Sequence, residues 1–509
     1  VVGTGGGVDR RGGKEGSIVS VVERGNTTLI GRLFDDEGIA YVVPDNKRIT
    51  QNILIPANMF GGAKPGQIVK VEITSQPTSR KQMVGKVADV IGEHMAPGME
   101  IEIEIHNHGI PYEFPEAAMQ QAEKFGDSVK EKDKQGRLDL RGLPLVTIDG
   151  ADARDFDDAV YCEPRDNGWK LIVAIADVAH YVDIGSPLDE EAYERATSVY
   201  FPGRVVPMLP EALSNGLCSI NPEVDRLCMV CEMMVNKQGE VESYDFKEAV
   251  MRSHARLTYT QVAEALKDED TGEIAADIYP HIENLNNMYQ ALDGARRRRG
   301  TIEFDTTETV INFNDDKRID SIRPAERNDA HKIIEECMIS ANVCAAKYIA
   351  KSKSPCLYRI HEDPADEKIE DLRGFLSDLD LKLGDPSRKI SSSDYAELSA
   401  QIQGRDDYHM IQTLMLRSMK QAIYTAENHG HFGLALTHYT HFTSPIRRYP
   451  DLLVHRALKH IIRKGKKEDY MYSQDRMVVM GEHCSSNERR ANEATRDAEF
   501  ALKCEYMLD

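Results

Sequence analysis

The sequence predicts a multidomain protein, with a small β-barrel first and a larger α+β domain after it. Three observations support this prediction. The chain has 509 residues, more than one hydrophobic core usually serves. Short β-branched runs separated by Gly, Pro, Asn and Asp fill residues 17–90. From residue 143 onward, strand-like runs come first and helical periodicity takes over from about Tyr259.

Five or six short runs within residues 17–90 are typical of a barrel that closes on itself. Arg32, Phe34, Tyr41 and Lys47 could give this barrel the aromatic and basic face that oligonucleotide-binding barrels use. We therefore expect Phe34 and Tyr41 to contact a nucleic acid strand. The alternative is that both rings pack inside the barrel.

The rest of the chain reads as a connecting segment and a mixed domain. Residues 91–145 contain an expected helix near Pro115 to Phe125. Five strands are expected at "LPLVTI", "DAVYCE", "WKLIVAIADV", "RLCMVCEMMV" and "SYDFKEAVM". The expected helices are Gln261 to Leu266, Ile282 to Arg299, Asp329 to Lys351, Asp406 to Asn428, Ile446 to Arg463 and Asp475 to Met507.

The composition is that of a globular protein without a membrane span. Hydrophobic residues make up 41% of the chain, and no apolar run approaches the roughly 18 residues that a span needs. The nine cysteines are scattered and odd in number, which favours a reducing compartment, so we expect a cytoplasmic protein. The net charge is −21, but residues 1–90 carry 12 Lys and Arg against 9 Asp and Glu. A mildly basic front on an acidic body fits a binding module attached to a carboxylate-rich enzyme.

The most informative stretch is "TIDGADARDFDDAV", residues 147–160, which gathers five aspartates within ten residues. Asp149 follows one expected strand, and Asp157 and Asp158 precede the next. The loop between them must fold back, which brings Asp155 and these three carboxylates to the adjoining ends of two strands. Like charges so close repel one another and raise each other's pKa unless a cation neutralises them.

Oxygen ligands of this kind select Mg²⁺, with Mn²⁺ as the alternative. Two such ions can activate a water and stabilise the leaving oxygen of a phosphodiester. The competing interpretation is a solvated turn, because Asp also favours loops through Asx hydrogen bonds. The flanking strands and the D-x5-D-x-D-D spacing favour the metal site.

Several long motifs resemble the catalytic RNB domain of the ribonuclease II/ribonuclease R family. They are "VTIDGADARDFDDAVYCE", "SVYFPGRVVPMLPEALSNGLCSINP", "RLCMVCEM", "RNDAHKIIEECMISAN", "RIHEDP" and "HFTSPIRRYPDLLVHRAL". The similarity extends from about Ser17 to the last residue. It implies a processive, hydrolytic 3'-to-5' exoribonuclease that releases nucleoside 5'-monophosphates.

The resemblance also implies a domain order and a truncation at both ends. Residues 1–26 resemble the end of a first cold-shock barrel, and residues 27–90 resemble a second one of the OB-fold type. Residues 91–145 connect this barrel to an RNB catalytic domain over residues 146–509. A C-terminal S1 barrel of the family would follow the last residue.

The family holds its catalytic metal with four aspartates, which match Asp149, Asp155, Asp157 and Asp158. Asp157 matches the residue whose loss abolishes cleavage while leaving binding. Asp152 matches no family position and is expected to be solvated. An aromatic pair clamps the 3' end of the RNA in the family, because stacking holds bases without reading them. Tyr200 and Phe304 match this pair, although without the family either ring would be placed in the core.

The segment "TSPIRRYPDLL" is typical of a helix start, with Ser444 as the cap and Pro445 in the first turn. Arg447 matches the family arginine that contacts the phosphate near the scissile bond, so we expect it to act in catalysis. Arg448 is expected either to bind RNA or to form a surface ion pair.

Three other features are discounted. Cys228 and Cys231 form a CxxC without a second ligand pair, and strand alternation explains both as buried. His438 and His441 are expected to bond the arginine loop. The arginine run before Gly300 either touches RNA or ends a helix.

We therefore expect a monomer that binds the 3' end of single-stranded RNA, and structured RNA with a 3' overhang. Two rival functions stay open. One is a catalytically silent RNA-binding protein on the same scaffold, since fold does not imply function. The other is a DNA-directed or endonucleolytic enzyme that uses the same metal site.

Overall fold

The computed structural model describes residues 27–507 apart from residues 79–80, 95, 269–271, 273 and 305–307. Before residue 27 it describes the backbone of two strands, β1 (Val2–Val8) and β2 (Lys14–Ser20), which pair with each other as a separate antiparallel ribbon. The expected remnant of a first barrel, residues 1–26, lies otherwise outside the described residues. Residues 17–20, at the start of the first β-branched run, belong to this ribbon, and the strands of the barrel begin at Thr28.

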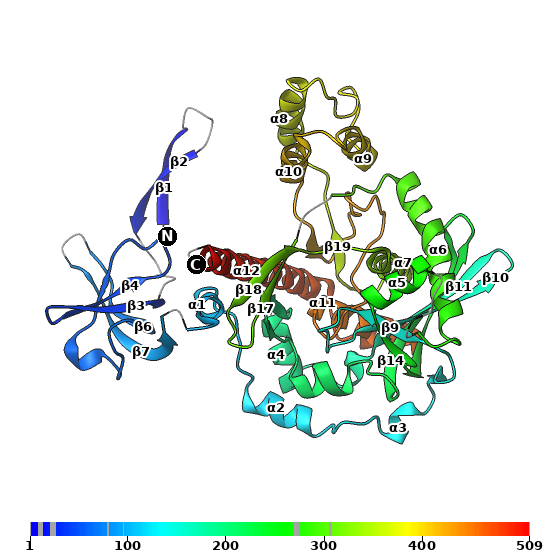
Figure 1. Cartoon of the computed structure of the whole chain (residues 1–509), viewed down its shortest axis with the longest axis horizontal. Helices are drawn as coiled ribbons and strands as arrows, with labels where there is room; N and C mark the ends of the chain where they lie inside the picture. Colours follow the sequence, from blue (N-terminus) through cyan, green and yellow to red (C-terminus); the bar gives the residue numbers. More distant parts are fainter. Residues whose placement is uncertain are drawn as a thin grey trace.

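A closed five-stranded barrel follows, in the order β3-β4-β5-β7-β6. Its inward positions alternate along each strand and are filled by aliphatic side chains such as Leu33, Val42 and Val71, which are fully buried. The closed barrel predicted from the sequence is confirmed (Figure 1). Its strands are β3 (Thr28–Asp36), β4 (Ile39–Pro44), β5 (Ile53–Leu54), β6 (Gln67–Ser75) and β7 (Met83–Glu93).

The connecting segment contains three helices: α1 (Met99–Asn107), α2 (Glu116–Glu123) and α3 (Glu131–Lys134). The helix expected near Pro115 is α2, whereas α1 was not predicted. Its sequence "MEIEIEIHN" alternates apolar and acidic residues, which is the periodicity of a strand. On a helix, the same alternation places apolar side chains on two opposite faces.

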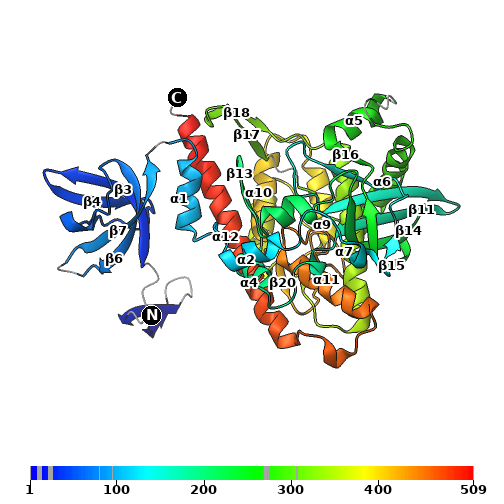
Figure 2. The same cartoon turned by 90° about the horizontal axis from the view of Figure 1, so that it is seen from below.

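Both faces of α1 are used, because the helix lies between the barrel and the rest of the chain (Figure 2). Met99 and Ile103 pack against barrel residues. Ile101 and Ile105 pack against α12 (Gln474–Tyr506), the long C-terminal helix. The helix thus acts as a packed joint and not as a free linker.

The large domain is built on a seven-stranded sheet in the order β16-β9-β10-β11-β14-β15-β8. The central pairs are antiparallel, while the edge strands β16 and β8 pair in parallel with their neighbours. All five strands expected in this domain are confirmed as β9, β10, β11, β14 and β15. The bounds are β8 (Leu138–Asp139), β9 (Val146–Asp149), β10 (Asp158–Arg165), β11 (Gly168–Ala176), β14 (Asp225–Asn236), β15 (Val241–Arg252) and β16 (Ala255–Thr258).

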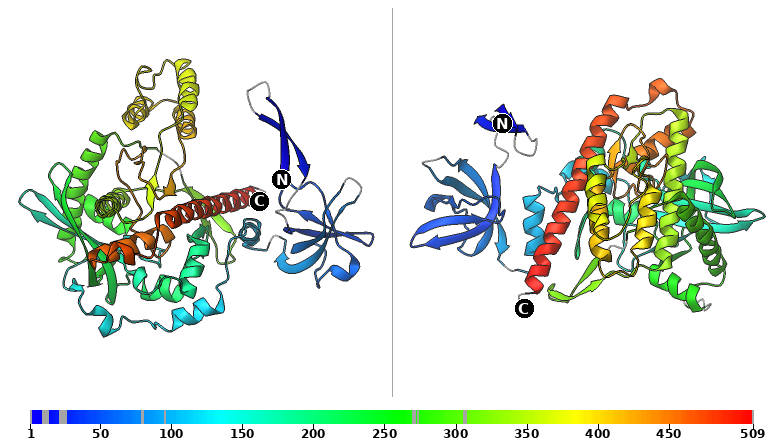
Figure 3. Two further views of the ribbon diagram at one scale, coloured as in Figure 1. Left: turned by 180° about the vertical axis from the view of Figure 1, so that it is seen from behind. Right: turned by 90° about the horizontal axis from the view of Figure 1, so that it is seen from above.

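Helices cover both faces of this sheet, so its central strands are apolar on both sides. One face carries α5 (Tyr259–Asp268), α6 (Tyr279–Arg299) and α7 (Asp329–Ser352). The other carries α4 (Pro187–Arg195) and the first turns of α11 (Tyr449–Ile462). Figure 3 shows α11 and α12 following one another past the sheet toward the barrel.

A separate helical lobe projects from the domain (Figure 1). It consists of α8 (Asp366–Ser377), α9 (Ser392–Gln401) and α10 (Tyr408–Ser418), which share a small core. The helix expected over residues 406–428 is therefore wrong beyond Ser418. The chain turns extended at Met419, and β20 (Ile423–Thr425) pairs with β19 (Tyr358–Ile360), a tertiary contact that overrides local helix propensity.

Two further strand pairs and four short helical turns complete the description. Strands β12 (Val199–Phe201) and β13 (Arg204–Val206) form a hairpin, as do β17 (Thr309–Phe313) and β18 (Ile319–Pro324). Short helical turns occur at Ala57–Met59, Val178–His180, Ala212–Leu217 and Lys467–Asp469. Among the described residues, none of the helices combines the length and the apolar character needed to span a membrane.

Candidate active site

The aspartate loop joins two neighbouring strands of the large sheet, as the sequence predicted. Asp149 is the last residue of β9 and Asp158 is the first of β10, and the two strands are antiparallel neighbours. Asp155 and Asp157 lie in the loop between them. Asp157 is 5% exposed, whereas Asp152 is exposed, as expected for a residue outside the cluster.

Each of three carboxylates has a specific partner. The backbone N–H of Gly150 donates to Asp149 Oδ1 at 2.7 Å, and the Tyr200 hydroxyl donates to Asp155 Oδ2 at 2.6 Å. The backbone N–H of Ile446 donates to Asp157 Oδ1 at 2.9 Å. The loop is thus held in place by groups from distant parts of the chain.

The cluster is electrostatically unfavourable without a cation. Burial raises the pKa of Asp157 well above its ordinary value, and burial raises the pKa of Asp149. Burial, together with the nearby Asp149 carboxylate, raises the pKa of Asp158 to about 7. Removal from water and mutual repulsion both disfavour the charged forms, and a divalent cation would relieve both.

The donor set fits such a cation. Asp157 Oδ2 is buried and has no hydrogen-bond partner among the described residues, although Arg447 Nε lies 3.4 Å away. An unpaired buried carboxylate oxygen is a free ligand position. The four carboxylates do not converge on one point. In the described part of the chain, no three of them have oxygen atoms that all lie within 4.8 Å of one another. A bound ion would draw them together.

Two residues that sequence reasoning missed hold the backbone of this loop. The fully buried Ser219 hydroxyl accepts from the N–H of Phe156 at 3.0 Å and donates to the carbonyl of Arg154 at 2.8 Å. It therefore hydrogen-bonds both peptide groups that flank Asp155. The Arg256 guanidinium donates to the carbonyls of Ala151 and Ala153. The only sequence signal for Ser219 was its place inside a long family-like motif.

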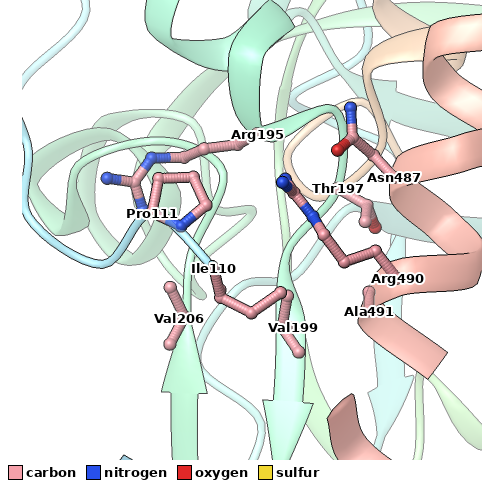
Figure 4. Close-up of a pocket in the computed structure, with 9 residues that line it drawn as sticks. All are labelled: Ile110, Pro111, Arg195, Thr197, Val199, Val206, Asn487, Arg490 and Ala491. Atoms are coloured by element: carbon pink, nitrogen blue, oxygen red, sulfur yellow. The ribbon is translucent and has the colours of Figure 1, made fainter. Parts of the chain in front are cut away.

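Tyr200 reaches the site because strand alternation turns it away from its neighbours. Its ring is 41% exposed, while Val199 and Phe201 are buried against α1 and α12. Figure 4 shows the far side of this strand, where Thr197 and Val199 face Asn487 and Arg490 of α12 across a cavity of about 10 Å³. The hairpin is thus backed by α12.

Phe304 is placed in a different hollow from the aspartates. It packs against the core of the helical lobe and lines a cavity of about 420 Å³. The cavity is also lined by the ring of Tyr408 and by basic and acidic side chains that pair with one another, Arg296 with Glu335 and Glu336, and Arg327 with Glu335. The structure therefore brings Tyr200 to the aspartates and leaves Phe304 in a separate pocket of mixed charge.

The turn before α11 differs from the predicted helix start. The helix begins at Tyr449, with Arg448 at the N-cap position, so Ser444 does not cap it and Pro445 lies before its first turn. The compact turn 444–448 arises because the N–H groups of Arg447 and Arg448 both donate to the Ser444 carbonyl. Its exposed end presents Arg447, and the Arg447 guanidinium donates to Ser444 Oγ at 2.9 Å.

The outer face of the barrel carries the predicted aromatic and basic residues. Phe34 and Tyr41 lie opposite each other on β3 and β4, with ring centroids 5.7 Å apart and planes 18° apart. The Arg32 guanidinium lies 5.2 Å from the Phe34 ring centre. Both rings are half-buried and lie outside the barrel core, so the alternative of packing inside is wrong. Lys47 is exposed in the turn after β4.

The discounted features have structural explanations. Cys228 and Cys231 are fully buried in cores on opposite faces of the sheet, so they cannot share a zinc ion. His441 Nδ1 lies 2.8 Å from the Tyr424 hydroxyl and His438 Nδ1 lies 3.2 Å from Thr437 Oγ1, so neither makes the expected bond to the arginine loop. The arginine run ends α6 before the left-handed Gly300, and its members bond nearby carboxylates and carbonyls.

One other set of ligand-type atoms lies close together within the described residues. Glu104, His108 and Asp497 meet where α1 packs on α12, with His108 Nε2 at 3.4 Å from Glu104 and 3.1 Å from Asp497. The Glu104 carboxylate, helped by Asp497, raises the pKa of His108. A protonated His108 therefore ties the joint helix to α12.

Comparison with known proteins identifies the family. A family model of the RNB domain matches residues 137–464. The chain belongs to the RNB family. A cold-shock domain model matches residues 41–115, ahead of this RNB domain. The fold class predicted from the sequence, an OB-type cold-shock barrel followed by an α+β RNB domain, is therefore confirmed.

Named RNB relatives are ribonucleases. Ribonuclease R of Vibrio parahaemolyticus is 55% identical over 98% of this chain and 61% of that protein. Ribonuclease R of Escherichia coli is 52% identical over 99% of this chain and 63% of that protein. The chain thus spans somewhat over three-fifths of the length of these relatives.

Solved structures agree with this RNB assignment. Mycoplasma genitalium RNase R in complex with ribose-methylated single-stranded RNA has a TM-score of 0.91 and 27% identity, covering 96% of this chain and 78% of that one. The same enzyme in complex with double-stranded RNA gives a TM-score of 0.91 and 27% identity, over 96% and 87% of the two chains. Yeast Ssd1, a pseudonuclease, shares the fold alone, with a TM-score of 0.74 and 19% identity over 97% of this chain and 62% of that one.

Proposed function

We propose that the chain is a magnesium-dependent, processive 3'-to-5' exoribonuclease that hydrolyses RNA to nucleoside 5'-monophosphates. The observation that supports this most directly is the cluster of Asp149, Asp155, Asp157 and Asp158, because burial raises the pKa of Asp149, Asp157 and Asp158 and a divalent cation would offset that cost. The naming of relatives at 55% and 52% identity as ribonuclease R supports the RNA substrate.

In this mechanism the four aspartates hold one or two Mg²⁺, with Mn²⁺ as the alternative. When bound, such ions supply an activated water and stabilise the leaving oxygen of a phosphodiester. The Tyr200 hydroxyl fixes Asp155, and the Ile446 N–H fixes Asp157. Arg447 lies beside Asp157 and is 42% exposed, so its guanidinium can reach the scissile phosphate and stabilise the charge that develops there.

The remaining site residues hold the strand. The Tyr200 ring stacks on a base at the 3' end, and Phe304, in its separate pocket, stacks on another. The outer barrel face, Arg32, Phe34 and Tyr41, holds RNA farther from the 3' end. The substrates are single-stranded RNA and structured RNA with a 3' overhang, and the enzyme acts as a cytoplasmic monomer.

The fold likeness to a pseudonuclease makes a catalytically silent RNA-binding protein the specific rival. The cluster argues against that rival, because burying several carboxylates is costly unless they serve a purpose. A DNA-directed or endonucleolytic activity would use the same carboxylates.

One assay separates these functions. Uniformly labelled RNA and DNA of the same sequence are incubated with the protein in Mg²⁺ and in chelator, together with RNA whose 3' end is blocked by an inverted nucleotide. Mononucleotides from unblocked RNA alone, and only in Mg²⁺, are expected. Internal fragments would point to an endonuclease, and binding without products to the silent protein.

A further inference from the structure

The two neighbouring arginines before α11 have different environments. The Arg447 side chain is 42% exposed and faces Asp157. The Arg448 side chain is only 19% exposed, and its Nη2 donates to Asp451 Oδ1 at 2.8 Å. Arg448 Nε is buried and has no hydrogen-bond partner among the described residues, so this guanidinium is turned to the interior.

Asp451 is the centre of this arrangement. Its side chain is fully buried in the first turn of α11. The same Oδ1 that accepts from Arg448 also accepts from the backbone N–H of Ser444 at 2.8 Å. One carboxylate therefore ties the helix to the first residue of the turn 444–448.

Because Asp451 holds Ser444 in place, the hydrogen bonds of Ser444 in turn position the groups that face the aspartate loop. Its carbonyl accepts the N–H groups of Arg447 and Arg448, and its hydroxyl accepts from the Arg447 guanidinium. The next residue but one, Ile446, donates its N–H to Asp157. Fixing Ser444 fixes both contacts to Asp157.

We propose that Arg448 and Asp451 form a buried positioning pair, which sets Arg447 and the Ile446 N–H against Asp157 and makes no contact with RNA. This inference rests on the proposed function and deepens it. Arg448 acts through Asp451 and Ser444, as the ion-pair partner of a fully buried carboxylate. Phosphate binding by this turn belongs to Arg447 alone.

The test compares Arg448→Met with Arg447→Met in RNA binding and in single-turnover cleavage. Loss of one phosphate contact lowers the salt dependence of single-stranded RNA binding by about 0.7 in log–log slope. Arg447→Met is expected to show this loss. Arg448→Met is expected to keep the slope, to change the RNA Kd by less than about twofold, and to lower the cleavage rate about 10- to 100-fold, because misplacing a reacting group has that effect. Arg448→Lys should recover part of the rate.

A double variant separates positioning from simple stability. Arg448→Met alone removes the cation that pairs with the buried Asp451 carboxylate, which can unfold the chain. Arg448→Met with Asp451→Leu removes both charges, so folding should return while the cleavage rate stays low. Full recovery of the rate in the double variant would assign the pair to stability alone, and a reduced salt slope in Arg448→Met would assign Arg448 to RNA. A wild-type protein that released no mononucleotides would instead overturn the proposed function, and the salt slopes would still report on Arg448.

Discussion

The aspartate loop and the outer face of the barrel are both expected to meet RNA, but they are built in opposite ways. The loop gathers buried carboxylates that are held by Tyr200, Ile446 and Ser219 from distant segments. The barrel face is a pair of half-exposed rings, Phe34 and Tyr41, on neighbouring strands. The geometry of the loop is fixed by hydrogen bonds from several segments. The barrel face is formed simply by placing the two rings on adjacent strands.

This difference assigns the chemical step to the aspartate loop and RNA binding to the barrel face. Carboxylates removed from water repel one another and a cation relieves that repulsion, so changes there should affect the rate. Stacking faces are tolerant of position because every base has a π-face, so changes there should affect affinity. Three sets of substitutions test this division and a fourth tests the joint helix α1, in order from the largest expected effect to the smallest.

Asp157→Asn is expected to lower the cleavage rate by about 10³-fold or more, because it removes a buried charge from the metal-holding set. RNA binding should change by less than about twofold. The matched control is Asp152→Asn, an exposed aspartate of the same loop, which should cleave at the wild-type rate. Single-turnover cleavage and filter binding measure the two quantities. A normal rate for Asp157→Asn would remove the loop from the mechanism.

Tyr200→Phe and Tyr200→Ala separate the two uses of one ring. The first keeps the stacking surface and loses only the hydrogen bond to Asp155. A bond to a charged group contributes about 1.5–3 kcal/mol, so a fall in kcat of about tenfold or more is expected with KM unchanged. The second should raise KM as well. Equal KM values for both variants would contradict stacking by Tyr200.

Phe34→Ala together with Tyr41→Ala is expected to raise KM about tenfold and leave kcat unchanged, because each stacked base contributes about 1–3 kcal/mol. Ile39→Ala, at an exposed position on the same hairpin, serves as the control and should behave like wild type. Steady-state kinetics on a long RNA report both constants. A fall in kcat would mean that the barrel face acts on the reaction and not on holding.

His108→Ala tests the joint between the two regions and should have the smallest effect. Since the pKa of His108 is raised, its contribution to stability is present below its ordinary value of 6.5 and is lost as pH rises through the higher folded value. The variant should therefore lose a few degrees of Tm near about pH 5.5 and almost none near about pH 9. The pKa of His106, on the same helix, is lowered by burial, so His106→Ala should show the opposite trend. Thermal unfolding at both pH values measures this.

Much of the fold followed from local patterns. The barrel strands and the five large-sheet strands alternate or run apolar as their environments require, and the aspartates fell at the predicted strand ends. The helix expected beyond Ser418 failed because pairing between β20 and β19 is a long-range contact that no local pattern carries. Likewise, the two-faced helix α1 has the periodicity of a strand.

The sequence predicted the aspartates of the site, but it did not predict the residues that hold them in place. Asp149, Asp155, Asp157 and Asp158 are close in sequence, so their spacing indicates a shared purpose. Ser219 and the pair of Arg448 and Asp451 act across turns and distant segments, and single hydroxyls or ion pairs have no signature of spacing. The sequence also left Arg448 open between RNA and an ion pair, because burial decides between them.

Because α1 carries apolar side chains on two opposite faces, this one short helix sets the orientation of the barrel relative to the catalytic domain. The barrel packs against Met99 and Ile103 on one side of the helix. The catalytic domain packs against Ile101 and Ile105 on the other side. Because the two sets of contacts alternate along the helix, a single inserted residue would rotate the later members of both sets by about 100° relative to the earlier ones. Neither side could then keep its full packing, and the orientation of the barrel relative to the catalytic domain would be lost.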